Sequence, residues 1–421
     1  MEDKEIFIVP HAGGNLLYAP LQGKVMFSKE DFKEKTKDEL FDILMRRGAN
    51  VYSKKANMDY LKYLPSELVI LLTRDCNLRC RYCYSQGGDS KEKLRWPAAK
   101  KAIEFSFNEK LRQKEKRFTI DFVGGGEPTL NWDVLIKSVS YAKELCKNAD
   151  MELSTGIITN GAFNNDKCEW IIENIDRISI SFDILKDVQN NQRPLPGGMP
   201  SYDLVLNNIK KIDANGIRFG IRSTISRDVV NLIPDMARFV SSSFKHVDTL
   251  LMAPVFEIGR CYETDLKSPE KSDFAKYFLE AKDIGKEHGI NVTCNLVNLD
   301  RISLTFCKAL STYFGITPDA CVTACQQVDS ASYPQSDVFI YGKYDTKNDR
   351  FNIDLKKIDR LRKRRVDKIP KCTDCFAKYQ CCGGCSFKVV MNKKDLYSPD
   401  TSSCEITKSL LAKELYDKTI F

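Results

Sequence analysis

A regular alternation of strand-like and helix-like segments, from Glu67 to about residue 288, constrains the fold most. Apolar runs of strand length are followed each time by a segment with helical periodicity, and this order is typical of βα units with a parallel sheet and outer helices. The expected strands are Leu68–Thr73, Phe118–Val123, Leu153–Thr159, Ile178–Phe182, Ile217–Thr224 and Thr249–Ala253. The expected helices are Pro97–Phe107, Asp133–Cys146, Asp166–Asn174, Tyr202–Ala214, Val230–Ser241 and Asp273–His288.

Six such units are fewer than the eight strands of a closed barrel, so we expect an open, partial (β/α)6 barrel over residues 66–288. The chemistry of such a barrel is expected at the C-terminal ends of its strands. The length of 421 residues allows two or three domains at about 150 residues each. We predict an N-terminal extension at 1–65, a Cys-rich domain at 289–404 and a C-terminal helix within 405–421.

The N-terminal extension has two features of regular structure. Apolar residues around Leu16–Met26, with Gly23 among them, predict a hairpin. Ser28 is expected to cap a helix that runs to Arg47, and Gly48 is expected to end that helix.

Composition and charge exclude some classes of protein and leave others open. Apolar residues make up 43% and charged residues 29%, which is ordinary for a soluble globular chain. The longest apolar runs, such as Leu68–Leu72, are far shorter than the about 20 residues of a membrane span, and the N-terminus shows no signal peptide. We therefore expect a cytoplasmic protein with no membrane partner. The net charge of +8 fits nucleic acid or acidic partners equally, and the basic run Lys356–Lys368 is interpreted as a solvated helix face, with a docking surface as the alternative.

Cysteine is unusually frequent, with 16 Cys against three His. In a reducing compartment, clustered Cys residues bind metals or do redox chemistry more often than they form disulfides. The scarcity of His excludes sites built mainly from that residue.

The first Cys cluster is Cys76-x3-Cys80-x2-Cys83, directly after the first expected barrel strand. Zinc sites usually take four ligands in two pairs, whereas iron–sulfur clusters are held by Cys thiolates. Three thiolates on a four-iron cluster would leave one iron open to a small molecule. A zinc knuckle completed by a distant residue is the alternative.

The second motif follows the next strand and reads Gly124-Gly125-Gly126-Glu127-Pro128. Consecutive glycines let a ligand approach the backbone closely, and Glu127 could take an ammonium group. The signature of a nucleotide phosphate loop is absent.

Together these two motifs resemble the radical S-adenosylmethionine (radical SAM) enzymes over residues 67–260. The resemblance implies that Cys76, Cys80 and Cys83 bind a [4Fe–4S] cluster whose open iron is chelated by SAM. It also implies SAM-binding roles for residues that match the family motifs, namely Tyr82, Gly125, Gly126, Glu127, Pro128, Ser181 and Arg193. The family's usual Gly after Asp183 is Ile184 here, and its usual His-Asp pair before the Arg is Gln189-Asn190. No catalytic acid or base is identified.

The third constellation is Cys372-x2-Cys375-x5-Cys381-x3-Cys385, followed by Cys404, and a zinc ribbon is its alternative reading. It resembles the SPASM extension of radical SAM enzymes, which carries two auxiliary [4Fe–4S] clusters. The family's Gly-x4-Cys hairpin is matched with Ala320 in place of Gly. The first auxiliary cluster would be held by Cys307, Cys325 and Cys385, with Cys321 or Cys294 as candidates for a fourth ligand or with an open iron. The second would be held by Cys372, Cys375, Cys381 and Cys404, and Cys382 is interpreted as a buried, inert thiol.

The resemblance implies three [4Fe–4S] clusters, SAM, and an electron donor such as a flavodoxin or ferredoxin. We expect a peptide maturase that abstracts hydrogen from a ribosomally made precursor peptide to form a thioether or carbon–carbon crosslink, and no nucleic-acid partner. Residues 1–65 could be part of a peptide-recognition element or a packing extension. One alternative is a sulfatase-maturating type of enzyme that makes formylglycine, which would need an Asp where this chain has Gln326. The other is a non-catalytic iron–sulfur or zinc module that binds nucleic acid.

Overall fold

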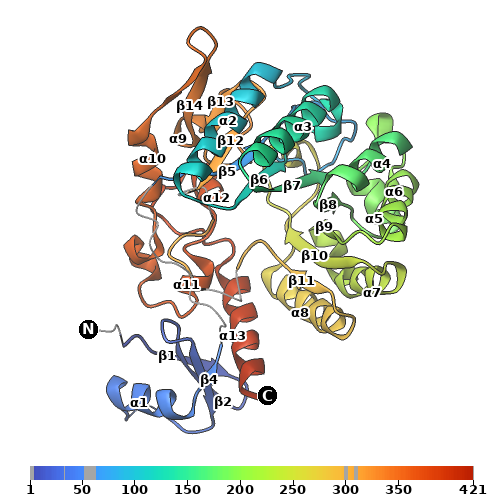
Figure 1. Cartoon of the computed structure of the whole chain (residues 1–421). Coiled ribbons are helices and arrows are strands. Elements are labelled where there is room, and N and C mark those ends of the chain that lie inside the picture. The colour runs from blue at the N-terminus through green and yellow to red at the C-terminus, as the bar shows by residue number, and fades with distance from the viewer. Residues whose placement is uncertain (1–3, 33, 52–62, 298–301, 308–311, 421) are drawn as a thin grey trace. The chain divides into compact units, whose positions relative to one another are not determined.

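The chain is described here by a computed structural model that covers residues 4–32, 34–51, 63–297, 302–307 and 312–420 (Figure 1). It divides into two compact units. The barrel unit comprises Lys62–Cys294 and Lys308–Leu361, and the terminal unit comprises Met1–Leu61, Asn295–Cys307 and Arg362–Phe421. This division cuts through the predicted 289–404 domain, so the domain boundaries drawn from the sequence stay a prediction.

The barrel unit is built on a sheet whose central strands are the six that the sequence predicts, in chain order and parallel (Figure 1). Each strand contributes buried apolar residues, and in β9 the burial alternates strictly along the strand. The prediction of a parallel α/β sheet is therefore confirmed. These strands are β5 (Glu67–Ile70), β6 (Arg117–Phe122), β7 (Glu152–Thr159), β8 (Arg177–Ser181), β9 (Phe219–Ile225) and β10 (Val247–Pro254).

Helices cover the outer face of this sheet and confirm the expected βα order (Figure 1). In α3, for example, Val134, Leu135, Val139, Ala142 and Cys146 recur at helical spacing and are all buried. The sequence did not predict α5, which follows β8. The helices are α2 (Trp96–Arg112), α3 (Trp132–Asn148), α4 (Asn165–Asn174), α5 (Lys186–Gln192), α6 (Tyr202–Ala214), α7 (Ile233–Ser243) and α8 (Lys271–Glu287).

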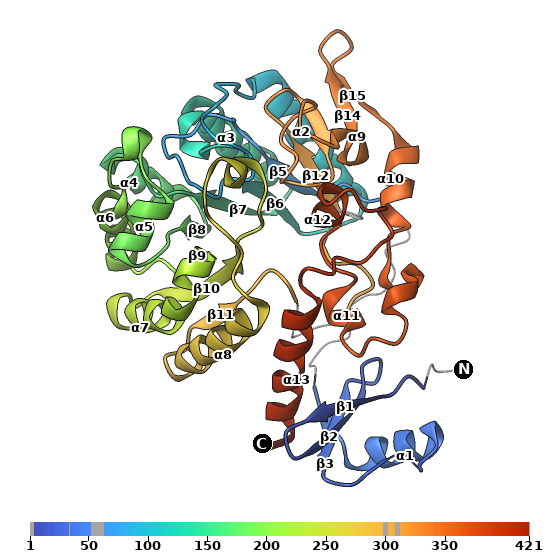
Figure 2. The same ribbon diagram turned by 180° about the vertical axis from the view of Figure 1, so that it is seen from behind.

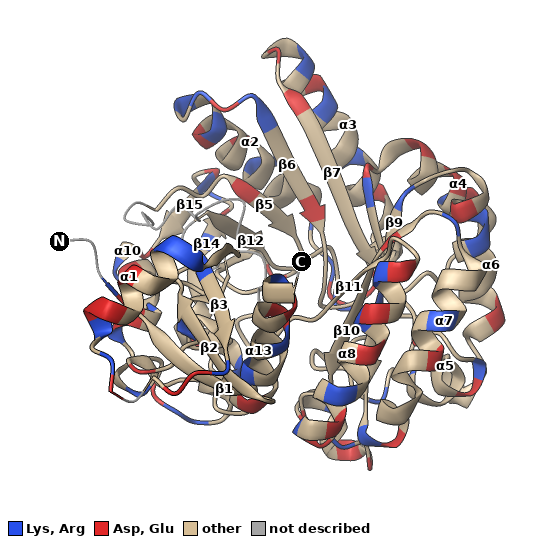
Figure 3. Cartoon of the chain, turned by 90° about the horizontal axis from the view of Figure 1, so that it is seen from below, with Lys and Arg blue, Asp and Glu red and all other residues tan. Residues whose placement is uncertain are grey.

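Figure 3 shows acidic and basic residues mixed on α7 and α8. Arg238 of α7 pairs there with Glu280 of α8 at 3.0 Å. None of the described helices combines the length and the apolar character needed to cross a membrane.

The sheet is open, because its two edges, β11 (Asn291–Thr293) and β15 (Arg350–Ile353), do not pair with each other. This confirms the partial barrel. Beyond the predicted strands, β12 (Tyr313–Ile316) pairs in parallel with β5, and an antiparallel extension follows through β13 (Cys321–Thr323), β14 (Ile340–Asp345) and β15. A short helix, α9 (Ser336–Phe339), precedes β14. The hairpin with the predicted ligand Cys325 thus belongs to the barrel sheet.

The terminal unit begins with a four-stranded antiparallel sheet in the order β1-β2-β3-β4, which lies beside α1 and the C-terminal helix α13 (Figure 2). The strands are β1 (Phe7–His11), β2 (Gly14–Ala19), β3 (Lys24–Ser28) and β4 (Ala49–Asn50), and the helices are α1 (Lys37–Arg47) and α13 (Cys404–Ile420). Leu16, Tyr18 and Val25 of the sheet pack against Leu411 and Leu415 of α13. The predicted hairpin and the predicted last helix are therefore confirmed.

The predicted start of the first helix is wrong. Ser28 is the last residue of β3 and pairs with Asn15, so it cannot cap a helix. The helix begins at Lys37, where the Thr36 side chain accepts from the Glu39 backbone N–H and the Glu39 side chain accepts from the Thr36 N–H. Gly48 ends the helix as expected.

The basic run 356–368 is only partly the solvated face that the sequence predicts. Its first part lies in α10 (Leu355–Arg362), which buries Ile358 and Leu361 and exposes Lys356 and Arg360. Arg364 departs from the prediction, because it is only 2% exposed. The remaining short helices of the terminal unit are α11 (Lys378–Cys381) and α12 (Ser386–Met391).

Ala320, which stands where the family's hairpin has Gly, adopts a left-handed backbone with φ of 59°. Its N–H donates to the Thr317 carbonyl at 2.9 Å, so the turn itself requires this conformation. Because Cβ is strained there, Ala320→Gly is expected to raise the free energy of unfolding by about 1 kcal/mol in urea denaturation.

The control is Ala214→Gly in the last turn of α6, where the same exchange is expected to destabilise by about 0.5–1 kcal/mol. A loss of stability in both variants would contradict the inference that the backbone of Ala320 is strained.

Candidate functional site

The three Cys of the first motif lie in the loop between β5 and α2, at the C-terminal end of β5. Polar groups surround their sulfur atoms. The Leu78 N–H approaches Cys76 Sγ at 3.5 Å, and the Gly87 N–H approaches Cys83 Sγ at 3.3 Å. The Asn160 amide lies 3.7 Å from Cys76 Sγ. Hydrogen bonds directed at sulfur are a feature of iron–sulfur sites, whose potentials they help to set.

Burial makes these thiols hard to ionise without a metal. It raises the pKa of Cys76 to about 12, with a further contribution from Cys80. Burial also raises the pKa of Cys80 to about 11, against the opposing charge of Arg193. In the described part of the chain, no three Cys, His, Asp or Glu side chains converge as ligands of one ion would. The fit therefore rests on the donor set: three neighbouring thiols with N–H donors suit the thiolate ligation of an iron–sulfur cluster.

Two arginines clamp the backbone of the Cys loop. Arg79 donates through Nη1 to the Cys76 carbonyl at 2.7 Å. Arg260, from the segment after β10, donates to the carbonyls of Cys80 at 3.2 Å and Gly87 at 3.1 Å, and pairs with Asp89 at 2.8 Å. Arg260 is only 8% exposed, and the sequence analysis missed it because it lies far along the chain.

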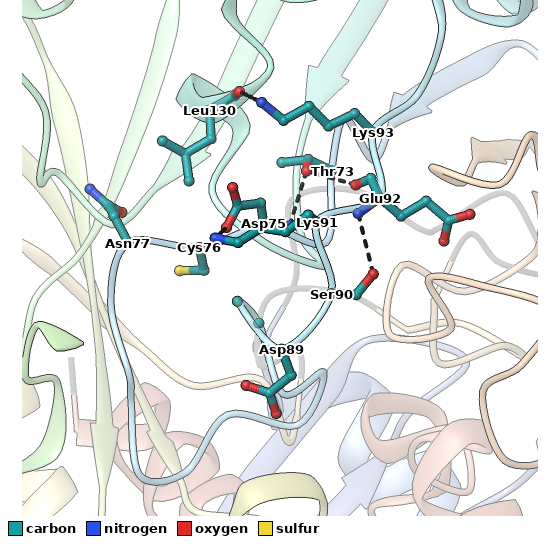
Figure 4. Close-up of polar contacts among 12 residues, drawn as sticks. Thr73, Asp75, Cys76, Asn77, Asp89, Ser90, Lys91, Glu92, Lys93 and Leu130 are labelled. Atoms are coloured by element: carbon teal, nitrogen blue, oxygen red, sulfur yellow. Dashed lines mark hydrogen bonds and ion pairs between the residues drawn. The ribbon is translucent and has the colours of Figure 1, made fainter. Parts of the chain in front are cut away.

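A second set of contacts fixes both stems of the loop (Figure 4). Thr73 donates from Oγ1 to the Glu92 carbonyl at 2.8 Å, and Lys91 pairs with Asp75 at 2.6 Å. Lys93 donates to the Leu130 carbonyl at 2.6 Å, which ties the Cys loop to the turn after β6.

The glycine-rich motif lies against the Cys loop. Gly126 N–H donates to the Thr73 carbonyl at 2.7 Å, and a Cβ on Gly126 would lie 1.9 Å from the Asp75 carbonyl. A Cβ on Gly87 would lie 3.3 Å from the Cys76 Cβ and 3.0 Å from the Gly125 carbonyl. The structure therefore brings the two predicted motifs together, and the close approach explains why the turn needs Gly.

Glu127 is fully enclosed and acts within the turn. Its Oε1 accepts from Thr159 Oγ1 at 2.8 Å and from the Thr129 N–H at 3.1 Å, and its Oε2 accepts from the Asn160 N–H at 2.8 Å. A carboxylate has about four acceptor sites, so about one stays open for an ammonium group. Pro128 follows directly and begins the short 3-10 helix Pro128–Leu130.

Tyr82 and Arg193, which the sequence places 111 residues apart, meet in one buried network. Tyr82 donates to Asp183 Oδ2 at 2.8 Å, and Arg193 Nη1 donates to the Tyr82 hydroxyl at 2.7 Å. The other Asp183 oxygen accepts from the Thr224 N–H at 3.0 Å. The Nε of Arg193 is buried without a hydrogen-bond partner, so one donor is left for a ligand. Ile184 follows Asp183 at φ of 67°, a strained position for a β-branched residue.

Ser181 ends β8 and stands in register with Arg222 of β9. Burial lowers the pKa of Arg222, and the Tyr84 hydroxyl opposes this effect. The sequence analysis did not single out Arg222, because a lone Arg in a strand carries no motif.

Asp329 is the most unusual carboxylate near the site and was also missed. It is fully buried, and neither oxygen has a hydrogen-bond partner. Arg74 Nε lies 3.6 Å from Oδ2, and a Cβ on Gly125 would lie 3.2 Å from the same oxygen. Burial raises the pKa of Tyr84 and of Tyr333, and the charge of Asp329 raises both further. An acceptor that is open on both oxygens beside the glycine motif is suited to take a donor or a proton from a ligand.

The four predicted ligands of the second auxiliary cluster line one cavity of the terminal unit. This cavity has a volume of about 240 Å³, and Cys372, Cys375, Cys381 and Cys404 line it. Burial raises the pKa of Cys372 to about 11, and the neighbouring Cys375 and Cys404 raise it further. A cavity lined by four thiols, with Lys371, Lys378 and Lys408 at its wall, fits an anionic cluster of the iron–sulfur type.

Cys382 is not one of the described residues that line this cavity. Its Sγ donates to the carbonyls of Ser303 at 3.2 Å and Tyr379 at 3.1 Å, as a buried, inert thiol would. The predicted ligands of the first auxiliary cluster are distributed over both units, with Cys325 in the barrel unit and Cys307 and Cys385 in the terminal unit. Cys321 and Cys294 are buried in the barrel unit. That ligand set stays a prediction.

Comparison with known proteins identifies the central segment. Residues 70–232 match the model of the Radical SAM superfamily. An uncharacterised protein of Methanocaldococcus jannaschii is 27% identical over 189 residues, which cover 44% of this chain and 63% of the relative. The Fe-coproporphyrin III synthase of Methanosarcina barkeri is 26% identical, with 39% and 38% covered, and the cysteine-type anaerobic sulfatase-maturating enzyme of Clostridium novyi is 24% identical, with 41% and 47% covered. The match thus spans less than two thirds of each of these relatives.

Solved structures resemble more of the chain. The structure of anSMEcpe with bound AdoMet has a TM-score of 0.60 at 16% identity and covers 85% of this chain and 97% of its own. Streptococcus suis SuiB bound to the precursor peptide SuiA has a TM-score of 0.58 at 16% identity, with 96% and 99% covered. At this identity the likeness establishes the fold.

The clamp by Arg260 generates a prediction. Arg260→Gln removes charged donors from two loop carbonyls and from Asp89, so we expect the free energy of unfolding to fall by about 3 kcal/mol. A chelator should also strip iron from the reconstituted variant faster than from the wild type. Arg238→Gln, on an exposed ion pair of α7, is the control and is expected to change stability by about 1 kcal/mol or less. Equal behaviour of the two variants would rule out the clamp.

Asp329 gives a pH-dependent prediction. Burial raises the pKa of Asp329 from 3.8 to about 6, so the folded chain holds this proton more tightly than the unfolded chain does. The stability that the bound proton contributes is fully present below pH 3.8 and is lost as the pH rises through 6. Asp329→Asn should therefore stabilise the fold above pH 6 by up to about 3 kcal/mol, at 1.36 kcal/mol per pH unit. The lost pairing with Arg74 reduces this gain.

The measurement is urea denaturation of the variant and the wild type between pH 4.5 and 8. Asp187→Asn, on an exposed part of α5, is the control and should leave the profile unchanged. A gain for Asp329→Asn that does not shrink below pH 6 would argue against a buried, ionised carboxylate.

Proposed function

Residues 70–232 form a radical SAM domain, and from this premise we propose that the chain is a radical SAM peptide maturase with two auxiliary clusters in a SPASM-type extension. The observation that carries the proposal is the presence of two separate sets of thiols in one chain. One set lies at the end of β5 against the glycine-rich turn, and the other lines a cavity of its own. A radical SAM enzyme without auxiliary clusters would not need the second set.

In the proposed site, the chain's own residues position SAM beside the first cluster. Cys76, Cys80 and Cys83 would hold the cluster and leave one iron for the amino and carboxylate groups of SAM. The turn Gly125–Gly126 offers backbone groups at close range, and Glu127 offers one remaining acceptor site for the ammonium group. Arg193, with its unpartnered Nε, is suited to the carboxylate.

When bound, the cluster and SAM supply a 5′-deoxyadenosyl radical, which takes a hydrogen atom from an unactivated carbon. The residues around them hold the reacting groups in place and exclude water. Asp329 offers an open acceptor near the glycine motif for a proton that leaves the substrate. Tyr333 donates from its hydroxyl to the Tyr84 carbonyl at 3.0 Å, which fixes Tyr333 beside the Cys loop.

A peptide substrate is supported by the solved structures of similar fold. SuiB is described as bound to the precursor peptide SuiA, and anSMEcpe as bound to the Cp18Cys peptide. The likeness to SuiB extends over 96% of this chain, including the N-terminal region. We propose that a precursor peptide is the partner, that the product is a thioether or carbon–carbon crosslink, and that a flavodoxin or ferredoxin supplies electrons.

A sulfatase-maturating activity is the second candidate, because the Clostridium novyi relative carries that name. Gln326 argues against this activity, because it stands where an Asp would be needed and its amide cannot accept a proton as an Asp carboxylate would. Gln326 lines a cavity of about 260 Å³ with Val69 and Asp121. Formylglycine on a sulfatase peptide would decide for this candidate.

The test is anaerobic reconstitution followed by incubation with SAM and a strong reductant. We expect about 12 iron and matching sulfide per chain, on the assumption of three four-iron clusters, and steady release of 5′-deoxyadenosine. With the peptide encoded beside the gene, a loss of two hydrogens per modification would indicate a crosslink. Zinc without sulfide and no 5′-deoxyadenosine would instead favour the non-catalytic, nucleic-acid-binding alternative.

Adjacent thiols give a matched pair of variants. Cys381→Ser removes a proposed cluster ligand and should lower the iron content by about four per chain, while Cys382→Ser alters a thiol that is not a proposed ligand and that donates to two carbonyls. Iron and sulfide analysis, with circular dichroism as a check on folding, measures both. Equal loss of iron in the two variants would contradict the ligand assignment.

A further inference from the structure

Arg364 is a buried cation in the middle of the Cys-rich part of the terminal unit. Its neighbours in the sequence are charged and more exposed, yet its own exposure is 2%. Its Nε donates to the Leu396 carbonyl at 2.7 Å, and its Nη2 donates to the carbonyls of Gly383 at 2.8 Å and Ser398 at 3.2 Å. These carbonyls fix the guanidinium but do not balance its charge.

Among the residues that the structure describes, no Asp or Glu lies within ion-pair distance of Arg364. The Gly383 carbonyl that Arg364 binds is flanked in the chain by Cys381 and Cys385, and it also accepts from the Asp400 N–H at 2.9 Å. The Asp400 carboxylate is already engaged, since its Oδ1 accepts from the Ser402 N–H at 3.1 Å. A buried guanidinium without a carboxylate partner is costly unless another anion lies close to it.

The thiols can supply that negative charge only when they are deprotonated as ligands of a metal cluster. A free thiol is neutral at neutral pH, because its ordinary pKa is about 8.5. Metal binding removes their protons and leaves thiolates on an anionic cluster. The guanidinium packs against the Gly383-Gly384 turn that leads to Cys385, with Nη2 3.7 Å from where a Gly383 Cβ would be.

We propose that Arg364 is the counter-charge of the auxiliary clusters bound through Cys381 and Cys385, and that it raises their reduction potential. This inference rests on the proposed function, because it assumes that those thiols hold clusters. Arg364 is a positioning residue and does not touch the substrate. Reduction adds negative charge to a cluster, so a fixed positive charge beside it favours the reduced state.

The test uses the full-length chain with C76A, C80A and C83A, so that only the auxiliary clusters contribute to the signal. Redox titration monitored by electron paramagnetic resonance compares this background with added Arg364→Gln, Arg364→Lys or Arg365→Gln. Arg365 is the matched control, because its guanidinium already pairs with Asp367 at 2.9 Å. Iron content and melting temperature are measured on the same samples.

We expect Arg364→Gln to make the auxiliary clusters at least tenfold harder to reduce at a given potential, a downward shift of about 59 mV for one electron. Arg364→Lys should recover most of this shift, and Arg365→Gln should show none. If Arg364→Gln loses iron, recovery of the iron by Lys supports the proposal. Equal loss in Gln and Lys variants overturns it.

A full iron content with an unchanged potential in Arg364→Gln also overturns the inference and leaves the proposed function standing. Absence of iron and sulfide from the wild-type chain would overturn both.

Discussion

The burial of cysteine sulfur in a polypeptide interior is the constraint on which the rest of the structure depends. Cys76 and Cys80 are difficult to ionise where they lie, so the chain has to supply donors and cations around them. It does so with backbone N–H groups aimed at sulfur and with two arginines that hold the loop carbonyls. In the terminal unit, Arg364 stands in a comparable relation to Cys381 and Cys385.

Two residues near these sites also have a strained backbone. Ile184 has a positive φ directly after Asp183, which holds Tyr82, and Ala320 has a positive φ in the hairpin that leads to Cys325. Each conformation costs of order 1–3 kcal/mol for a residue with a Cβ and persists because surrounding contacts fix it. The stability needed to hold these turns comes from the sheet, whose core strands β5 to β10 are buried.

The elements that the sequence predicted are those with a strong local signal. The six βα units were found because their apolar periodicity switches between two clear patterns. The prediction for Ser28 was wrong because a Ser before charged residues resembles a helix N-cap. Pairing with Asn15 places Ser28 in a strand instead. The observed capping box is formed by Thr36 and Glu39. The hairpin of β12 and β13 was predicted from the resemblance, but the parallel pairing of β12 with β5 was missed because the two strands lie far apart in the chain.

The sequence by itself determined which thiols are candidate ligands, because three Cys at fixed spacing on one loop and four within fourteen residues are local patterns that need no tertiary context. The fold decided which other groups meet them. Asp329, Arg260, Arg222 and Arg364 carry no motif, and each acquires its meaning only from burial beside residues distant in the chain. Charge and hydrogen bonding act over a few ångströms in space, and sequence separation does not record that distance.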